Sequence, residues 1–123
     1  MFNVELSTAD HDGHAVIALH GELDLADASA VASYLMTAVA ARGPSIIVDL
    51  ADLTFIDCCG LGILLRVLQW TRKCGGNMPL AAPQQRVRKV LSATGLMDVF
   101  SVYPSVDQAA ADLGLATLAA AAL

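Results

Sequence analysis

The run Ser-Ile-Ile-Val-Asp-Leu at residues 45–50 constrains the fold more than any other segment of the chain. It is short, nearly all apolar, and flanked on both sides by stretches with helical spacing. A strand that is apolar on both faces is typical of a parallel sheet whose two faces are covered. The flanking apolar residues that recur at helical intervals are Val31, Leu35, Ala38 and Val39 before the run and Leu61, Leu64, Leu65 and Leu68 after it. The segment therefore predicts an α/β fold.

The remaining strands and helices are predicted in an alternating order. Residues 2–7 alternate apolar and polar, and residues 15–20 follow a turn at Asp12-Gly13, so an antiparallel hairpin is expected. Residues 51–57 are expected to be extended or looped. Further strands are predicted at 78–82 and 98–103, and helices at 27–42, 59–73, 84–93 and from 105 onward. The chain is thus predicted to be one domain with a mixed sheet of about five strands and four helices, mainly on one side.

Three residues or pairs are predicted to shape the helix ends. Asp27 is placed to cap the first helix. Gly95 is expected to end the third helix in a left-handed conformation. Ser105 and Gln108 have the spacing of a capping box at the start of the last helix.

Composition and charge exclude several classes of function. Seven Lys and Arg residues against twelve Asp and Glu give a net charge of −5, which does not suit nucleic-acid binding, since phosphate contacts need clustered cations. No apolar run reaches the ~18 residues of a membrane span. The first residues lack the features of a signal peptide, so we expect a cytoplasmic protein. Three cysteines in such a chain are expected to be reduced thiols.

Two adjacent cysteines, Cys58 and Cys59, stand before a helical run in the stretch LTFIDCCGLGILLR at residues 53–66. The unpaired N–H groups and the dipole of a helix start favour anions, including a thiolate. One interpretation is therefore a reactive thiol, and the other is a pair of small residues tucked against the helix start. A disulfide to Cys74 is not expected, because a continuous helix would separate the residues by roughly 22–24 Å. The cysteines and histidines form no evident metal-ligand set or nucleophile–base pair, so neither a cofactor nor an enzyme is predicted.

The chain resembles the STAS domain family, and more narrowly the stand-alone anti-sigma factor antagonists of bacteria. The stretches that carry the resemblance are GELD at 21–24, DLTFIDCCGLGILLR at 52–66 and CGGNMPLAAPQQRVRKVLSATGL at 74–96. The STAS domain is expected to comprise residues 1–114, with 115–123 as a continuation of the last helix or a frayed tail. Because the apolar tail could pack on its own domain or on a second copy, a monomer or weak homodimer is expected.

The resemblance implies a switch between binding partners. An antagonist of this kind binds an anti-sigma factor that is also a serine kinase, and so frees a sigma factor. The kinase phosphorylates the hydroxyl residue after the signature aspartate, and the added charge of about −1.5 to −2 breaks the complex. Asp24 and Asp57 could also serve the local fold, as a turn residue and a helix cap. The implied partner-binding residues are Asp24, Asp57, Cys58, Cys59, Gly60, Leu61 and Gly62.

Cys58 departs from the family pattern, because it stands where the family carries its phosphoacceptor serine. Three consequences stay open: binding that is insensitive to phosphorylation, gating by thiol oxidation, or a role without a sigma factor as the STAS subunit of a transport or other signalling complex. The neighbouring Asp57 opposes thiolate formation by its like charge. Arg66 is expected either at the margin of the interface or as a solvated helix charge.

Overall fold

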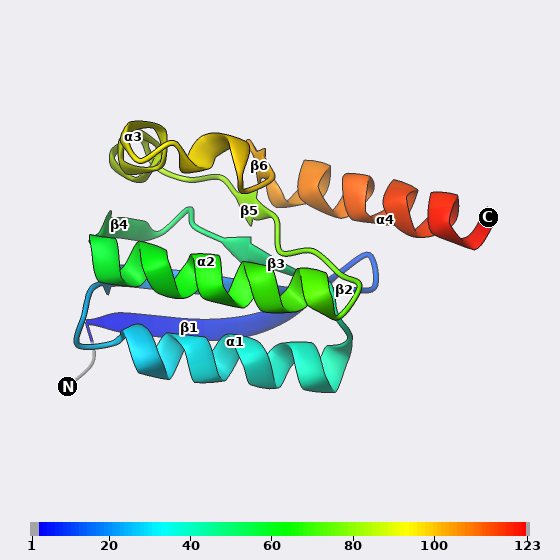
Figure 1. The fold of residues 1–123 in the computed structure, drawn as a ribbon, viewed down its shortest axis with the longest axis horizontal. Helices are drawn as coiled ribbons and strands as arrows, with labels where there is room; N and C mark the ends of the chain where they lie inside the picture. The colour runs from blue at the N-terminus through cyan, green and yellow to red at the C-terminus, as the bar shows by residue number, and fades with distance from the viewer. Residues whose placement is uncertain (1–2, 123) are drawn as a thin grey trace.

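The computed structural model describes residues 3–122 and the side chains of residues 3–115. Strands and helices alternate in the predicted manner (Figure 1). The strands are β1 (Val4–His11), β2 (His14–Leu23), β3 (Ile46–Asp49), β4 (Leu53–Ile56), β5 (Leu80–Ala81) and β6 (Val102–Tyr103). The helices are α1 (Ala28–Arg42), α2 (Cys58–Lys73), α3 (Gln85–Ala93) and α4 (Val106–Ala122), with a short 3-10 helix at Leu96–Asp98.

The strands form one mixed sheet in the order β1-β2-β3-β5-β6, and β4 pairs with β2 outside this order. β1 and β2 are antiparallel, while the other pairs are parallel. These pairings confirm the α/β class and the N-terminal hairpin. The sheet gains a strand over the predicted number because residues 53–56 pair with the end of β2. β2 is ten residues long, so the same edge of it has room first for β3 and then for β4.

The hairpin turns at Asp12-Gly13, as predicted. Both residues have positive φ, 52° and 82°, and the pairing of His11 with His14 closes a two-residue loop. This conformation matches the twist of the two strands and suits an Asp-Gly pair. β1 continues to His11, beyond the predicted end at residue 7, because its polar residues stay in register with β2.

Helices cover both faces of the sheet, with three of the four on one side. α1, α2 and α3 pack on the face that carries Ile17, Ile46 and Val48, and α1 lies beside α2 (Figure 1). α4 covers the opposite face. The residues buried there are Val16, Ile47 and Ala81 of the sheet with Ala109, Ala110 and Leu113 of α4. The continuous apolar run is therefore buried on both faces, as predicted.

The last strand is shorter than the predicted 98–103. Gly95 adopts the predicted left-handed conformation, with φ of 74°, but the chain then forms the 3-10 helix Leu96–Asp98. The N–H groups of Val99 and Phe100 donate to the carbonyl of Leu96. Because Phe100 is buried in the core, this extra turn is held in place, and only residues 102–103 pair with β5.

A hydrogen bond from the Tyr103 hydroxyl to the Asp112 carboxylate ties β6 to α4. Burial, together with this bond and the charge of Asp112, raises the pKa of Tyr103 to about 12. At the start of α4, Ser105 Oγ accepts from the Gln108 N–H at 3.2 Å, which is the first bond of the predicted capping box. α4 reaches Ala122, while the division of domain from tail at residue 114 stays a prediction. Within the described residues, no helix combines the length and apolarity that a bilayer span requires.

Candidate functional site

The predicted site residues meet where β2 and β4 end and α1 and α2 begin. Parallel strands that alternate with helices bring strand carboxyl ends and helix amino ends to one edge of the sheet. The loop 24–27 leads from β2 to α1, and Asp57 lies between β4 and α2. Figure 1 shows both connections at the same end of the molecule, opposite to the end of α4. Two motifs that lie far apart in the sequence therefore share one surface.

Asp57 joins the two connections through its carboxylate. It is the N-cap of α2, as predicted: Oδ1 accepts from the Gly60 N–H at 2.8 Å. Oδ2 accepts from the Leu25 N–H at 3.2 Å. The backbone N–H of Asp57 also donates to the carbonyl of Leu23 at 3.1 Å. One carboxylate thus holds the loop before α1 against the first turn of α2.

The two aspartates of the other loop have structural partners of their own. Asp24 forms the predicted turn, since its Oδ1 accepts from the Ala26 N–H at 3.0 Å, and its Oδ2 lies 3.4 Å from Asn3 Nδ2. Asp27 is the N-cap residue of α1, but the prediction that its side chain caps the helix is wrong. Asp27 is 2% exposed, and its carboxylate accepts from the Asn3 N–H at 2.8 Å instead. A hydrogen bond to the residue before β1 therefore replaces the expected hydrogen bond to the first turn of α1.

The cysteines of the predicted site are both exposed. α2 begins at Cys58, one residue before the predicted start at Cys59, and continues without a break to Lys73. The interpretation of two thiols tucked against the helix start is therefore wrong, because the side chains of Cys58 and Cys59 both face solvent. Cys74 is also exposed and lies beyond the opposite end of α2. Within the described residues, no group of three or more His, Cys, Asp or Glu side chains is arranged to hold a metal ion.

The Gly60-Leu61-Gly62 segment divides between the core and the surface. Gly60 is buried, and a Cβ atom there would lie 2.8 Å from the carbonyl oxygen of Leu23. Leu61 is 3% exposed and belongs to the core. A Cβ atom at Gly62 would meet nothing within 4 Å. Of these three residues, only Gly62 is accessible from solvent.

A shallow hollow of about 300 Å³ lies between the start of α1 and the first three turns of α2. We name it the α1–α2 groove, and its lining residues are Leu25, Ala28, Ser29, Cys59, Gly62, Ile63 and Arg66. Arg66 therefore lies at the predicted surface. Two larger hollows, of about 470 and 540 Å³, lie elsewhere. Their size does not make them better candidates, because none of the predicted site residues lines them.

Two exposed apolar residues close in sequence to Asp24 and Asp57 were missing from the predicted set, and one of them, Leu25, lines the α1–α2 groove. Leu25 is 70% exposed and Phe55 of β4 is 44% exposed. The exposure of Leu25 could have been predicted from the sequence, because an apolar side chain in a turn between Asp24 and Asp27 is not expected to reach the core. The exposure of Phe55 could not, because Leu53 and Ile56 of the same strand are also apolar and are buried. An exposed large apolar side chain at the wall of a groove, as Leu25 is here, is typical of a protein-binding surface.

Comparison with known proteins adds independent findings. The STAS domain family model matches residues 5–109. The anti-sigma-F factor antagonist RsfA of Mycobacterium tuberculosis is 29% identical over 101 residues, which cover 80% of this chain and 79% of RsfA. The crystal structure of an anti-sigma factor antagonist from Mycobacterium paratuberculosis aligns with a TM-score of 0.80 at 29% identity, over 89% of this chain and 93% of that chain. The anti-sigma factor antagonist SpoIIAA, in its unphosphorylated form, aligns with a TM-score of 0.72 at 25% identity, over 85% of this chain and 92% of that chain.

Proposed function

Because the chain belongs to the STAS domain family, we propose that it is an anti-sigma factor antagonist, a protein that binds an anti-sigma factor and so frees a sigma factor. Proteins described by that activity match it over most of its length. In this proposal the chain acts by binding and catalyses no reaction. Its partner is an anti-sigma factor with serine-kinase activity.

We propose the α1–α2 groove, with Cys58 beside it, as the docking surface. The observation that carries this assignment is the Asp57 carboxylate, which accepts from both the Leu25 and the Gly60 N–H groups. This bridge fixes an exposed leucine next to the exposed thiols of α2. An apolar anchor with polar groups around it is the usual composition of an interface centre.

Cys58 makes the complex insensitive to the partner's kinase activity in this proposal. A thiol takes the place of the hydroxyl that the kinase would phosphorylate. A phosphate there would add about −1.5 to −2 charges beside Asp57 and oppose docking. Without that charge, the antagonist stays bound while ATP is present.

Exposure of both thiols supports a second candidate, in which oxidation takes over the role of phosphorylation. Hydrogen peroxide would transfer one oxygen atom to the thiolate of Cys58, and with uptake of one proton from solvent the products are a sulfenic acid and water. The exposed neighbour Cys59 could then condense with the sulfenic acid and release a second water. Either product would change the shape and polarity of the docking surface.

The docking surface is tested by one substitution with a matched control. Leu25→Lys should weaken binding to an anti-sigma factor of the same organism by about tenfold or more in calorimetry, since a central apolar anchor is lost. Leu115→Lys should bind like the parent chain, because Leu115 is also largely exposed, at 65%, but lies on α4. Equal binding by the parent and both variants would show that the interface with the anti-sigma factor lies outside the α1–α2 groove. Failure of the parent chain to bind any anti-sigma factor would overturn the function itself.

The role of Cys58 is tested with the bound kinase and ATP. The parent chain should gain no phosphate in intact-mass measurements, while Cys58→Ser should gain one. Phosphate on Cys58 of the parent chain would contradict insensitivity to the kinase. Loss of binding after mild peroxide, with recovery in dithiothreitol, would favour the redox candidate, and persistence of that loss in Cys58→Ala/Cys59→Ala would refute it.

The other proposed role is that of a STAS subunit in a transport or signalling complex. Purification of the chain from its native cytosol distinguishes the two roles. Recovery of an anti-sigma factor supports the antagonist, whereas recovery of transporter or other signalling subunits alone supports the alternative.

A further inference from the structure

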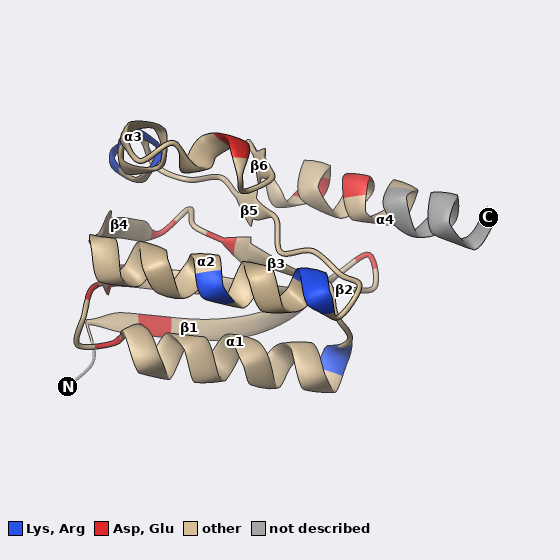
Figure 2. Cartoon of the chain, in the orientation of Figure 1, with Lys and Arg blue, Asp and Glu red and all other residues tan. Residues whose placement is uncertain are grey.

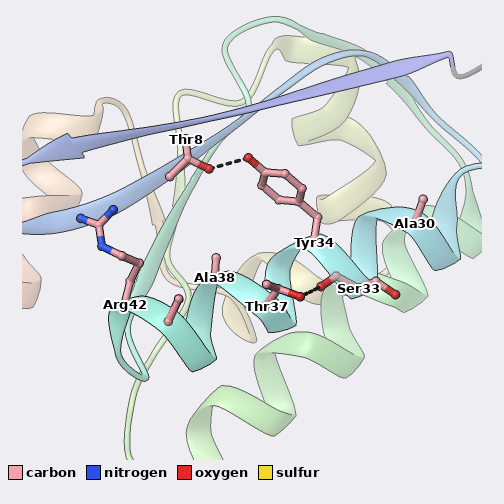
Figure 3. A pocket seen from close by; sticks show the side chains of 8 residues that line it. Thr8, Ala30, Ser33, Tyr34, Thr37, Ala38 and Arg42 are labelled. Carbon is pink, nitrogen blue, oxygen red and sulfur yellow. Dashed lines mark hydrogen bonds between the residues drawn. The ribbon is translucent and has the colours of Figure 1, made fainter.

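A second hollow lies between α1 and the edge strand β1 (Figure 3), on the opposite side of α1 from the α1–α2 groove. Its volume is about 470 Å³. We name it the β1–α1 groove, and its lining residues are Thr8, Ala30, Ser33, Tyr34, Thr37, Ala38, Ala41 and Arg42. The hydroxyl oxygens of Thr8 and Tyr34 lie 2.6 Å apart and link the strand to the helix across it. Arg42 pairs with Asp10 at one end.

β1 presents a free edge above this groove. It is the terminal strand of the sheet, and among the described strands it pairs with β2 alone. The Glu22 N–H donates to the Asn3 carbonyl at 2.9 Å, so residue 3 lies in a hydrogen-bonded pair. Such pairs alternate along an antiparallel ladder. The odd-numbered residues of β1 therefore bond to β2, and the N–H and C=O groups of Leu6, Thr8 and Asp10 point away from it.

The side chains of these even-numbered residues face α1. Thr8 contacts Tyr34, and Asp10 pairs with Arg42. The free backbone groups and the groove thus lie side by side along the same strand. A new strand next to β1 would pair with these backbone groups and cover the groove with alternate side chains.

The wall that α1 contributes is almost free of charge. Arg42, in the last turn, is its one charged residue, and the groove side of the helix carries mostly small side chains. Figure 2 shows α1 without acidic or basic residues until its end. Edge strands are usually protected by charged side chains or by a covering element. The ion pair between Asp10 and Arg42 protects the edge of β1 at one end of the groove. The other lining residues of the groove are uncharged.

We propose that the β1–α1 groove binds an extended segment of another protein, which adds to the sheet beside β1 and places apolar side chains in the groove at every second position. Free backbone donors and acceptors spaced along a strand are matched by another strand, and this is the basis of β-strand addition. The part of α1 that lines the groove, residues 30–42, is roughly 18 Å long at 1.5 Å per residue, and alternate side chains of a strand are ~6.6 Å apart, so two or three of them fit along it. Because the α1 side of the groove is uncharged along most of its length, the groove favours apolar over acidic side chains of the added strand. This surface is separate from the proposed docking surface for an anti-sigma factor.

A display library of random octapeptides, selected on the full-length chain, tests the proposal. The enriched peptides should share apolar residues at alternate positions. Synthetic copies should bind Thr8→Pro about tenfold or more weakly, because proline removes an outward N–H and places its ring in the path of the added strand. Proline is tolerated at such an edge position. Thr8→Val is the matched control, since it keeps the N–H and loses only the hydroxyl contact, and it should bind like the parent.

A second pair of variants tests the groove itself. Thr37→Trp fills the space and should abolish peptide binding. Ala40→Trp places the same side chain on an exposed position of α1 that does not line the groove, and should leave binding unchanged. Peptides that bind all four variants equally would overturn the proposal, and so would a selection that yields no binding peptide.

Amide hydrogen exchange of the free and bound chain gives an independent measurement. The N–H groups of Leu6, Thr8 and Asp10 should exchange quickly in the free protein and slow about tenfold or more with saturating peptide. Those of Ser7 and Ala9 should be slow in both states, because they bond to β2. Unchanged exchange at the three even-numbered positions would refute strand addition. A concentration-dependent dimer that Thr8→Pro abolishes would assign the edge to a second copy of the chain and would overturn a foreign segment as its occupant.

Discussion

Replacing Gly60 by alanine should destabilise the protein, although alanine is the better helix former. In the first turn of α2, a Cβ atom at this position would lie 2.7 Å from Leu23 Cγ, 2.8 Å from the Leu23 carbonyl oxygen and 3.2 Å from Ile56 Cγ1. The carbonyl belongs to the end of β2 and cannot rotate aside as a side-chain terminus could. α2 would have to move away from the sheet.

Gly62, two residues along the same helix, provides the matched control. A Cβ atom there meets nothing within 4 Å, so Gly62→Ala should stabilise by about 0.5–1 kcal/mol through the helix preference alone. Gly60→Ala gains the same preference but incurs an overpacking cost of about 1–3 kcal/mol. The preference cancels in the comparison, and the two variants should therefore differ by the overpacking cost. For a domain of this size, 1 kcal/mol corresponds to roughly 4 °C in Tm.

Urea unfolding followed by tryptophan fluorescence measures this difference directly. The chain has one tryptophan, Trp70, and it lies on α2, so the signal comes from the helix under test. The expected order of stability is Gly62→Ala above the parent and the parent above Gly60→Ala. Equal midpoints and slopes for the two variants would show that α2 does not approach Leu23 as closely as described, and the placement of the docking surface would then lose its basis.

Three further measurements test other parts of the structure. Asp57→Ala should lower the free energy of unfolding by about 1–2 kcal/mol, because the cap of α2 is lost, whereas Asp57→Asn should retain most of it; equal losses would argue against capping. Above pH ~10, where an unfolded tyrosine loses its proton, the parent chain should lose stability up to about pH 12, since the raised pKa of Tyr103 keeps the folded phenol protonated. Tyr103→Phe should show a shallower loss over that window, and parallel curves would contradict the assignment. An aromatic disulfide reagent should titrate three thiols in the folded protein without denaturant, and a slow fraction would contradict the exposure of Cys58, Cys59 and Cys74.

The parts of the fold that local pattern decides could be predicted from the sequence. The apolar run at 45–50 is buried on both faces, and Asp12-Gly13 forms the hairpin turn. The cap at Asp57 followed from an aspartate directly before a helical pattern. In each case the residues that determine the conformation are neighbours in the chain, so the conformation can be predicted from the local sequence pattern.

The features that the sequence did not reveal depend on distant partners. β4 is a strand because it pairs with the end of β2. No local pattern in residues 53–56 predicts this pairing. The Asp27 carboxylate bonds to the Asn3 N–H across the sheet edge rather than to its own helix. The exposure of both thiols depends on how the first turn of α2 packs. Leu61, part of the same predicted site, lies in the core because the Cβ-free Gly60 lets α2 approach β2.

The attachment of Asn3 to the loop before α1 has a practical consequence for experiments on this chain. Its backbone N–H bonds to Asp27, and its amide group reaches Asp24. An affinity tag or fluorescent fusion joined ahead of Asn3 would emerge beside the surface that is to be assayed, and its bulk or charge would compete with an incoming protein. α4 ends at the other end of the molecule (Figure 1). A bait for capture experiments is therefore better immobilised through its carboxyl terminus.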